Sequence, residues 1–317
     1  MKLYFTDPTS HQANGELYNL GDIIIKQAIA ANIQEFGEVN WIAIDQLSSG
    51  ALPPGSLLIL AGANILANNP FFNTSVWRPP LSEYLRKHYV LLFGIGWWQY
   101  QDKVNALSQA FYRRALVQDM LHSVRDGYTA RMLASCGVQN VLNTGCPTMW
   151  KLNDEYHFGE SKPGAVVFTL TDYYRDREHD QELVRMLLDE YEEVRFFPQG
   201  IGDCAYLSSL GFDSMRIRVL ERSLDAFDGL LQSDPIDYVG TRLHAGIRAL
   251  QNGRRAFVVS VDNRATEISR DTGLPVVERA ALGTLRKRIQ SEVDLNLRIE
   301  RQAIGRFKAS LPGIFAG

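Results

Sequence analysis

An arginine and a histidine stand close together at residues 240–250, where the sequence is GTRLHAGIRAL. An apolar run typical of a buried strand precedes this segment, and the residues after it have the pattern of an amphipathic helix. Thr241 is a candidate N-cap, which would place Arg242 and His244 in the first helical turn. A helix N-terminus has free backbone N–H groups and a partial positive charge. The segment therefore predicts a site for a phosphate or a carboxylate, with an imidazole that can transfer a proton.

Further polar residues follow other expected strands. Arg264 stands after the strand expected at 255–261, one βα unit beyond Arg242 and His244. Because the carboxyl ends of parallel strands meet at one edge of a sheet, these three residues should lie near one another. Gln199 closes the strand expected at 194–198; it either contacts a polar group of a ligand or serves only the turn.

The first half of the chain has its own strand-end residues. Asn19 and Asp22 stand at the start of the first long helix. Either both face a ligand and orient an acceptor hydroxyl, or Asp22 is simply the N-cap of this helix. Asn64 ends the run AGAN, whose small residues either allow a ligand to approach the backbone or form a tight turn. Arg125 is either an anion ligand or the partner of Asp126, which is the expected N-cap of the next helix.

Trp97 and Trp98 follow the strand expected at 89–93. Adjacent indoles point in different directions, so at least one should lie near the surface. A tryptophan at the rim of a cleft suits the apolar face of a sugar ring, and packing inside the core is the alternative for either indole.

Short apolar runs alternate with amphipathic segments along the chain, a pattern typical of parallel α/β units. The expected strands cover residues 2–5, 39–44, 56–60, 89–93, 121–124, 140–142, 165–170, 194–198, 217–219, 236–239, 255–261 and 276–277. The expected helices include residues 22–36, 81–87, 104–118, 127–135, 180–191, 203–209, 223–232 and 265–272.

A polar stretch and the breaker Lys162-Pro163-Gly164 indicate a domain boundary. We expect two Rossmann-like, doubly wound α/β domains that face a cleft: residues 1–155 on the acceptor side and residues 156–281 on the donor side. Residues 282–317 are expected to form one long helix, up to residue 310, and a tail. This helix carries a basic face, which is either solvated or in contact with an anionic membrane surface.

Composition excludes several classes of protein. The 317 residues carry a net charge of −3, which argues against a dedicated nucleic-acid partner. Three widely spaced cysteines give no disulfide framework and no zinc pattern, so we expect a cytoplasmic protein without a metal. The chain shows no signal peptide and no apolar run of the ~18 residues that would span a bilayer.

Several short motifs occur in a characteristic order. They are NLGD at 19–22, SVRD at 123–126, GCPT at 145–148, FFPQG at 196–200, GTRLHAGIRAL at 240–250, DNRATEI at 262–268 and TGLP at 272–275. In this order they resemble the polysaccharide pyruvyl transferase family. Two departures stand out: AGAN replaces a glycine-rich strand end typical of the family, and Arg264 stands where a lysine is common.

The resemblance implies an enzyme that transfers a pyruvyl group from phosphoenolpyruvate to a hexose of an exopolysaccharide or a cell-wall polymer precursor. It further implies formation of a pyruvate ketal, release of phosphate, a fold similar to the two-domain GT-B glycosyltransferases, and no cofactor besides phosphoenolpyruvate as co-substrate. The alternatives are a nucleotide-sugar-dependent glycosyltransferase and a non-catalytic protein that binds a sugar or an anion.

Within this hypothesis, His244 is the general acid or a phosphate ligand, and Asp22 is the base for the acceptor hydroxyl. A lipid-linked acceptor at the inner face of the plasma membrane would fit contact of the basic C-terminal helix with lipid. The donor ligands would be Arg242, Arg264, Arg125, Gln199 and Thr241, and the acceptor ligands Asn19, Asn64, Trp97 and Trp98.

Overall fold

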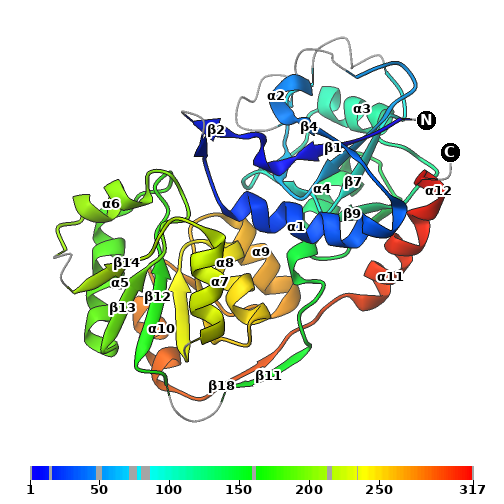
Figure 1. Cartoon of the computed structure of the whole chain (residues 1–317). Coiled ribbons are helices and arrows are strands. Elements are labelled where there is room, and N and C mark those ends of the chain that lie inside the picture. The colour runs from blue at the N-terminus through cyan, green and yellow to red at the C-terminus, as the bar shows by residue number, and fades with distance from the viewer. Residues whose placement is uncertain are drawn as a thin grey trace. The chain divides into compact units, whose positions relative to one another are not determined.

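The computed structural model (Figure 1) describes residues 2–13, 16–47, 52–70, 77–79, 86–158, 162–212, 216–233 and 235–315. The chain divides into two compact units. Unit 1 comprises Met1–Gln12, Ile25–Trp150 and Ile299–Gly317, and unit 2 comprises Ala13–Ile24 and Lys151–Arg298. The division at residue 150 differs from the expected boundary at residue 155, and each unit also includes a segment from elsewhere in the chain.

Unit 1 is built on a parallel sheet with the strand order β4-β1-β5-β7. Two of these four strands, β5 and β7, are buried along their whole length, as expected for a sheet covered on both faces. Two shorter parallel pairs, β9 with β10 and β6 with β8, complete the strands. The bounds are β1 Leu3–Asp7, β4 Asn40–Ala43, β5 Leu57–Ala61, β6 Asn64–Leu66, β7 Val90–Phe93, β8 Gly96–Trp97, β9 His122–Val124 and β10 Val141–Asn143.

Local signals explain where the helices of unit 1 begin and end. The side chain of Asp126 accepts a hydrogen bond from the backbone N–H of Thr129 at 2.7 Å, which confirms Asp126 as the N-cap of α4. Gly137, with a φ of 82°, follows the end of the same helix in the left-handed region. The helices are α1 Gly21–Ile33, which continues from unit 2, α2 Ile44–Leu47, α3 Ala106–Ala115, α4 Gly127–Ser135, α11 Arg301–Ser310 and α12 Pro312–Phe315.

Unit 2 contains a six-stranded parallel sheet with the order β14-β13-β12-β15-β16-β17. In chain order this is 3-2-1-4-5-6, the order of the doubly wound Rossmann fold, and its switch point lies between β12 and β15. Figure 1 shows α7 and α8 on one side of this sheet and α5 and α10 on the other. The strands are β12 Ala165–Thr169, β13 Glu193–Phe196, β14 Ile217–Val219, β15 Ile236–Gly240, β16 Ala256–Ser260 and β17 Val276–Glu278.

The helices of unit 2 follow these strands, as the alternating pattern predicts. They are α5 Arg177–Glu190, α6 Asp203–Ser209, α7 Leu224–Ser233, α8 Leu243–Gln251, α9 Asn263–Thr272 and α10 Leu282–Gln290. A separate antiparallel pair joins β11, Glu155–Phe158, to β18, Val293–Asn296. The short strands β2, Gln12–Ala13, and β3, Glu16–Leu17, also pair.

The prediction of one long C-terminal helix is wrong. Residues 282–315 instead form α10, β18, α11 and α12, and α10 and α11 belong to different units. The apolar spacing of four residues misled the prediction because it fits a strand of period two as well as a helix. Along β18, Val293 and Leu295 are buried while Asp294 and Asn296 are exposed, which is the alternation of a strand.

The basic residues of this region therefore form no continuous helical face. Arg286 on α10 lies 3.3 Å from Glu190, and Lys308 on α11 donates to Asn32 at 3.2 Å. Within the described part of the chain, no helix has the length and apolar character needed to cross a membrane. The helix expected at 81–87 lies mostly outside the described residues.

Candidate active site

Polar side chains gather at the carboxyl edge of the sheet in unit 2, where β12 and β15 mark the switch point. In parallel α/β sheets, this position opens a crevice that ligands commonly occupy. Arg242 directly follows β15, and the segment 170–173 directly follows β12. The structure thus places Arg242, the first of the expected donor residues, where the topology favours a ligand.

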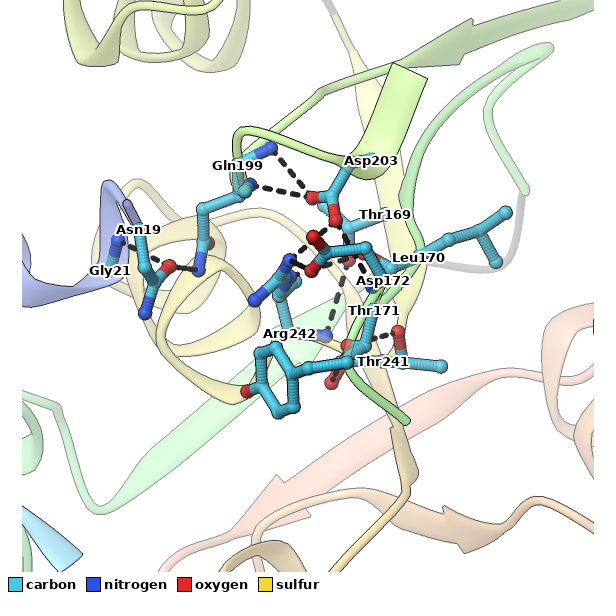
Figure 2. A network of polar contacts seen from close by, with 12 residues as sticks. Asn19, Gly21, Thr169, Leu170, Thr171, Asp172, Gln199, Asp203, Thr241 and Arg242 are labelled. Carbon is cyan, nitrogen blue, oxygen red and sulfur yellow. Dashed lines mark hydrogen bonds and ion pairs between the residues drawn. The ribbon is translucent and has the colours of Figure 1, made fainter. Parts of the chain in front are cut away.

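Arg242 is almost completely buried, with 2% of its surface exposed. Its Nε donates to the carbonyl of Leu170 at 3.1 Å, and its Nη2 donates to Asp172 at 3.0 Å and to Asp203 at 2.5 Å. Figure 2 shows the guanidinium directed at these two carboxylates. Two carboxylates on one arginine compensate its charge, so Arg242 is more firmly anchored than a surface anion ligand would be.

Two glycines make room for this ion pair. A Cβ added to Gly200 would lie 2.2 Å from Nη2 of Arg242, and one added to Gly202 would lie 2.3 Å from the Asp172 carboxylate. Both distances are far shorter than a van der Waals contact. The glycine of the FFPQG motif is therefore required by the arginine of the GTRLH motif, 42 residues later in the chain.

Asp203 organises the turn that precedes α6. One carboxylate oxygen accepts from the backbone N–H groups of Gln199 at 3.1 Å and Gly200 at 2.6 Å, and the other accepts from the N–H of Asp172 at 3.2 Å (Figure 2). Burial raises the pKa of Asp203, against the opposing effect of Arg242. This carboxyl therefore joins the turn after β13 to the segment after β12.

Gln199 connects this network to the segment 18–22. Its Nε2 donates to Oδ1 of Asn19 at 2.8 Å, and the backbone N–H of Leu20 donates to its carbonyl at 3.0 Å. Oδ1 of Asn19 also accepts from the N–H of Gly21 at 3.1 Å, at the start of α1. Asn19 and Gln199, predicted on opposite sides of a cleft, thus lie in one unit and in direct contact.

Two atoms of this network are buried, and no hydrogen-bond partner is found for them among the described residues. They are Nη1 of Arg242, a donor, and Oε1 of Gln199, an acceptor. Buried polar groups in native proteins are nearly always paired. A donor and an acceptor left over at a switch point are therefore a specific indication of a polar ligand.

Asp22 lies in the first turn of α1, and the predicted alternative of an N-cap does not apply. Its carboxylate accepts from Nδ2 of Asn19 at 3.2 Å. Burial raises its pKa to about 7, even though the nearby Arg264 and Arg242 act to lower it. Such a carboxyl can both give up and accept a proton near neutral pH, which is the property that acid–base catalysis requires.

Arg264 stands in the first turn of α9, as predicted. Asp262 caps this helix through the N–H of Arg264 at 2.9 Å and also accepts from its Nε at 2.7 Å. The Nη2 of Arg264 donates to the hydroxyl of Tyr173 at 3.0 Å, and the Tyr173 ring centroid lies 4.9 Å from Cζ of Arg242. The two arginines thus meet at the same side chain, and Arg264 keeps 24% of its surface exposed.

The first turn of α8 differs from the prediction in one respect. Thr241 is not the N-cap: the helix begins at Leu243, with Arg242 at the cap position. The backbone N–H of Thr241 donates to the carbonyl of Thr169 in β12 at 3.2 Å, and its hydroxyl lies 2.8 Å from that of Thr171. His244 does lie in the first turn and is buried, 6% exposed.

Two other predicted residues of the first half, Asn64 and Arg125, lie in unit 1 and form a separate group there. Nη2 of Arg125 donates to Asn64 at 2.7 Å, and its Nε donates to Asp126 at 3.2 Å. Of the two alternatives for Arg125, the structure shows the pairing with Asp126. A Cβ on Gly96 would lie 2.3 Å from Cζ of Arg125, so this guanidinium is closely packed as well as paired.

The placement of Trp97 at a cleft rim is wrong. Its side chain is fully buried, and its Nε1 donates to Gln101 at 2.6 Å, so its ring belongs to the core of unit 1. Trp98 is only partly buried. The strand β8, which was not predicted, turns the first of the two indoles inward.

Three important residues of the site escaped the sequence analysis. Asp172 and Tyr173 follow β12, and Asp203 begins α6. Asp172 and Tyr173 lie just past the strand expected at 165–170, and Asp203 starts the helix expected at 203–209; these positions were the signal that could have found them. Their partners were not predictable, because the contacts join segments that lie far apart in the chain.

Comparison with protein families identifies the family of the chain. The chain matches the family described as polysaccharide pyruvyl transferase over residues 17–263. This range covers more than half of the chain, includes Arg242 and ends one residue before Arg264. The chain therefore belongs to the polysaccharide pyruvyl transferase family, which is a family of transferases.

Comparisons with curated proteins and with solved structures identify no further family for the chain. No curated protein matches the sequence significantly. Among solved structures, the Escherichia coli heptosyltransferase WaaC with ADP-2-deoxy-2-fluoro heptose is similar with a TM-score of 0.34 and 12% identity, covering 91% of this chain and 99% of that one. WaaC with ADP gives a TM-score of 0.32 and 15% identity, covering 91% and 97%. Likeness at this level supports no inference about a nucleotide-sugar donor.

Proposed function

We propose that this protein transfers a pyruvyl group from phosphoenolpyruvate to a hexose of an exopolysaccharide or a cell-wall polymer precursor, forming a pyruvate ketal and releasing phosphate. The observation that carries the proposal is the buried network of Arg242 in unit 2, with its unsatisfied donor, beside the more exposed Arg264 and beside Asp22, whose pKa burial raises to about 7. Membership of the family supports the same reaction type.

Phosphoenolpyruvate carries a phosphate and a carboxylate, and guanidinium groups bind both as paired acceptors. Arg264 offers the exposed cation, and Nη1 of Arg242 offers a buried donor pair. The N-termini of α8 and α9 add their partial positive charge at the same edge of the sheet. This combination favours a small ligand with two anionic groups.

The reaction needs one proton delivered and others removed. A proton adds to the methylene carbon of phosphoenolpyruvate, a first sugar hydroxyl forms a bond to the adjacent carbon, and the bond to the phosphate oxygen breaks. A second hydroxyl then attacks the same carbon and closes the ketal, so each hydroxyl loses one proton. We assign proton delivery to His244 and proton removal to Asp22, whose pKa of about 7 suits a base at neutral pH.

A direct experiment tests the proposal. The purified protein is incubated with phosphoenolpyruvate and a panel of hexosides, while free phosphate and the mass of each acceptor are measured. Phosphate release together with an acceptor heavier by one pyruvate ketal supports the proposal. Activity only with a nucleotide sugar would replace it with a glycosyltransferase, and binding of sugar or anion without turnover would replace it with a binding protein.

A further inference from the structure

Tyr173 is an exposed aromatic residue in the middle of the candidate site. It follows β12 at the switch point, and 40% of its surface is exposed. Its hydroxyl accepts from Nη2 of Arg264 at 3.0 Å, while its ring lies against the guanidinium of Arg242, 4.9 Å from Cζ to the centroid. One side chain thus contacts both cations expected to bind the donor.

The segment around Tyr173 is held in place from several sides. The N–H of Asp172 donates to Asp203 at 3.2 Å, Nη1 of Arg279 donates to the carbonyl of Tyr174 at 2.8 Å, and the N–H of Asp176 donates to the hydroxyl of Tyr206 at 3.1 Å. A large aromatic ring kept partly exposed on a braced segment contributes little to the core. Its position is better explained by a task at the site.

Arg264 shows what that task is. Asp262 contacts the guanidinium of Arg264 at Nε, 2.7 Å away, and at Nη2, 2.6 Å away, and the hydroxyl of Tyr173 accepts from the same Nη2 at 3.0 Å. Asp262 and Tyr173 follow different strands, so the Tyr173 hydroxyl adds a hold from a second segment and further restricts the orientation of the planar group. A preoriented guanidinium binds an anion with less loss of conformational entropy.

We propose that Tyr173 is a positioning residue for the anionic donor: its hydroxyl orients Arg264, and its ring covers Arg242 from solvent. This inference rests on the proposed function for the identity of the donor. The positioning itself acts on any small anion that the two arginines bind. Inorganic phosphate and phosphoenolpyruvate are therefore both suitable probes.

The test uses Tyr173→Phe, which removes the hydroxyl and keeps the ring. A hydrogen bond from a charged donor is worth about a tenfold change in equilibrium constant. We expect KM for phosphoenolpyruvate and the Kd for phosphate, measured by calorimetry, each to rise about tenfold, with kcat changing little. Tyr156→Phe is the matched control, because its hydroxyl also accepts a hydrogen bond, from the backbone N–H of Asn153 at 3.2 Å, and Tyr156 belongs to the separate strand pair of β11 and β18.

A double-mutant cycle identifies the route through Arg264. Arg264→Lys keeps the charge but removes the planar group that the Tyr173 hydroxyl orients. We expect Tyr173→Phe to weaken phosphate binding about tenfold in the wild-type background and hardly at all in the Arg264→Lys background. A merely structural role would instead lower the melting temperature and give equal effects in both backgrounds.

The outcomes separate the two proposals. If Tyr173→Phe binds both anions like the wild type, or if the effects are additive, the positioning role is refuted. If the wild type binds phosphate with the expected dependence on Tyr173 but neither binds nor converts phosphoenolpyruvate, the positioning role holds and the proposed donor is wrong. If the wild type binds neither anion, both proposals are refuted.

Discussion

Replacing Asp22 with asparagine should stabilise the protein in alkaline solution while it abolishes most activity. Asparagine has nearly the same shape and can still accept the hydrogen bond that Nδ2 of Asn19 donates at 3.2 Å. It has no charge, however, and the charged form of Asp22 is the form that burial disfavours. The substitution therefore removes the free-energy cost of burying the charged carboxylate in the folded protein.

The sign follows from the direction of the pKa shift. The pKa of Asp22 rises from its usual value of 3.8 to about 7 on folding, so the folded state holds this proton more tightly than the unfolded state does. Stability from this group is fully present below about pH 4 and is lost as the pH rises to about 7. Above that pH, the wild-type protein carries the whole cost.

The magnitude can be bounded. Each pKa unit is worth about 1.4 kcal/mol, so the full shift corresponds to about 4 kcal/mol. Asp22 retains some exposure to solvent, and screening reduces the measurable part to about 1–2 kcal/mol. We expect the free energy of unfolding of Asp22→Asn to exceed that of the wild type by this amount at pH 8, and the difference to shrink toward pH 5.

Urea unfolding of both proteins at several pH values between 5 and 8 measures the difference. Asp7→Asn in unit 1 is the matched control with the opposite sign. Burial raises the pKa of Asp7, but hydrogen bonds from Lys26 and Thr9 outweigh it and lower the pKa overall. Its stabilising contribution is present above the usual value of 3.8 and lost in acid. Asp7→Asn should therefore lower stability at pH 8.

Activity completes this test. As a general base, Asp22 should contribute about 10²–10⁴ to the rate, and wild-type turnover should rise as the pH passes through about 7. An Asp22→Asn protein that is no more stable than the wild type at pH 8 would refute the reasoning about burial. One that keeps wild-type turnover and the same pH profile would refute the catalytic role.

Three further substitutions test other parts of the structure. Gly96→Ala should lower the free energy of unfolding by about 1–3 kcal/mol, because its Cβ would overlap the buried guanidinium of Arg125; urea unfolding measures this. Arg255→Met should lower it by about 3–5 kcal/mol, since Asp237 would stay buried without its bidentate partner, and an added Asp237→Asn should restore part of the loss. His244→Gln should lower turnover about 10²–10⁴-fold if His244 is the general acid, and near-normal turnover would exclude that role.

Sequence patterns were sufficient for the framework of unit 2. Its six strands were expected from apolar runs of two to seven residues, and the alternation with helices implied a parallel sheet. Once β15 and β16 were recognised as neighbouring strands, Arg242 and Arg264 had to lie at the same edge of the sheet. Their proximity therefore followed from topology and did not require any knowledge of side-chain packing.

The contacts of these residues could not be predicted in the same way. Asn19 and Gln199 are separated by 180 residues, and no local pattern pairs them. Arg242 pairs with Asp172, a turn residue after one strand, and with Asp203, the first residue of a helix after another. Thr241 matched the N-cap preference, but its backbone N–H donates to Thr169 in β12 and its hydroxyl contacts Thr171. In each case, a tertiary contact overrode a valid local preference.

The same contacts change how the two arginines should be understood. The sequence alone predicts two unpaired positive charges that would bind an anion. In the structure, four carboxylates contact them or lie close enough to influence them, so the fully ionised group would be net negative. These carboxylates are Asp22, Asp172, Asp203 and Asp262.

This charge balance assigns different tasks to the two arginines. Burial raises the pKa of both Asp203 and Asp22, so protons taken up there can offset the excess negative charge when an anion binds. Arg242 is 2% exposed and braces two segments of the site, so replacing it would disrupt the network together with any donor contact. Arg264 is 24% exposed and held by a single carboxylate, and its replacement should weaken anion binding while leaving the fold intact. Donor affinity is therefore better tested at Arg264, even though Arg242 is the more conspicuous residue in the sequence.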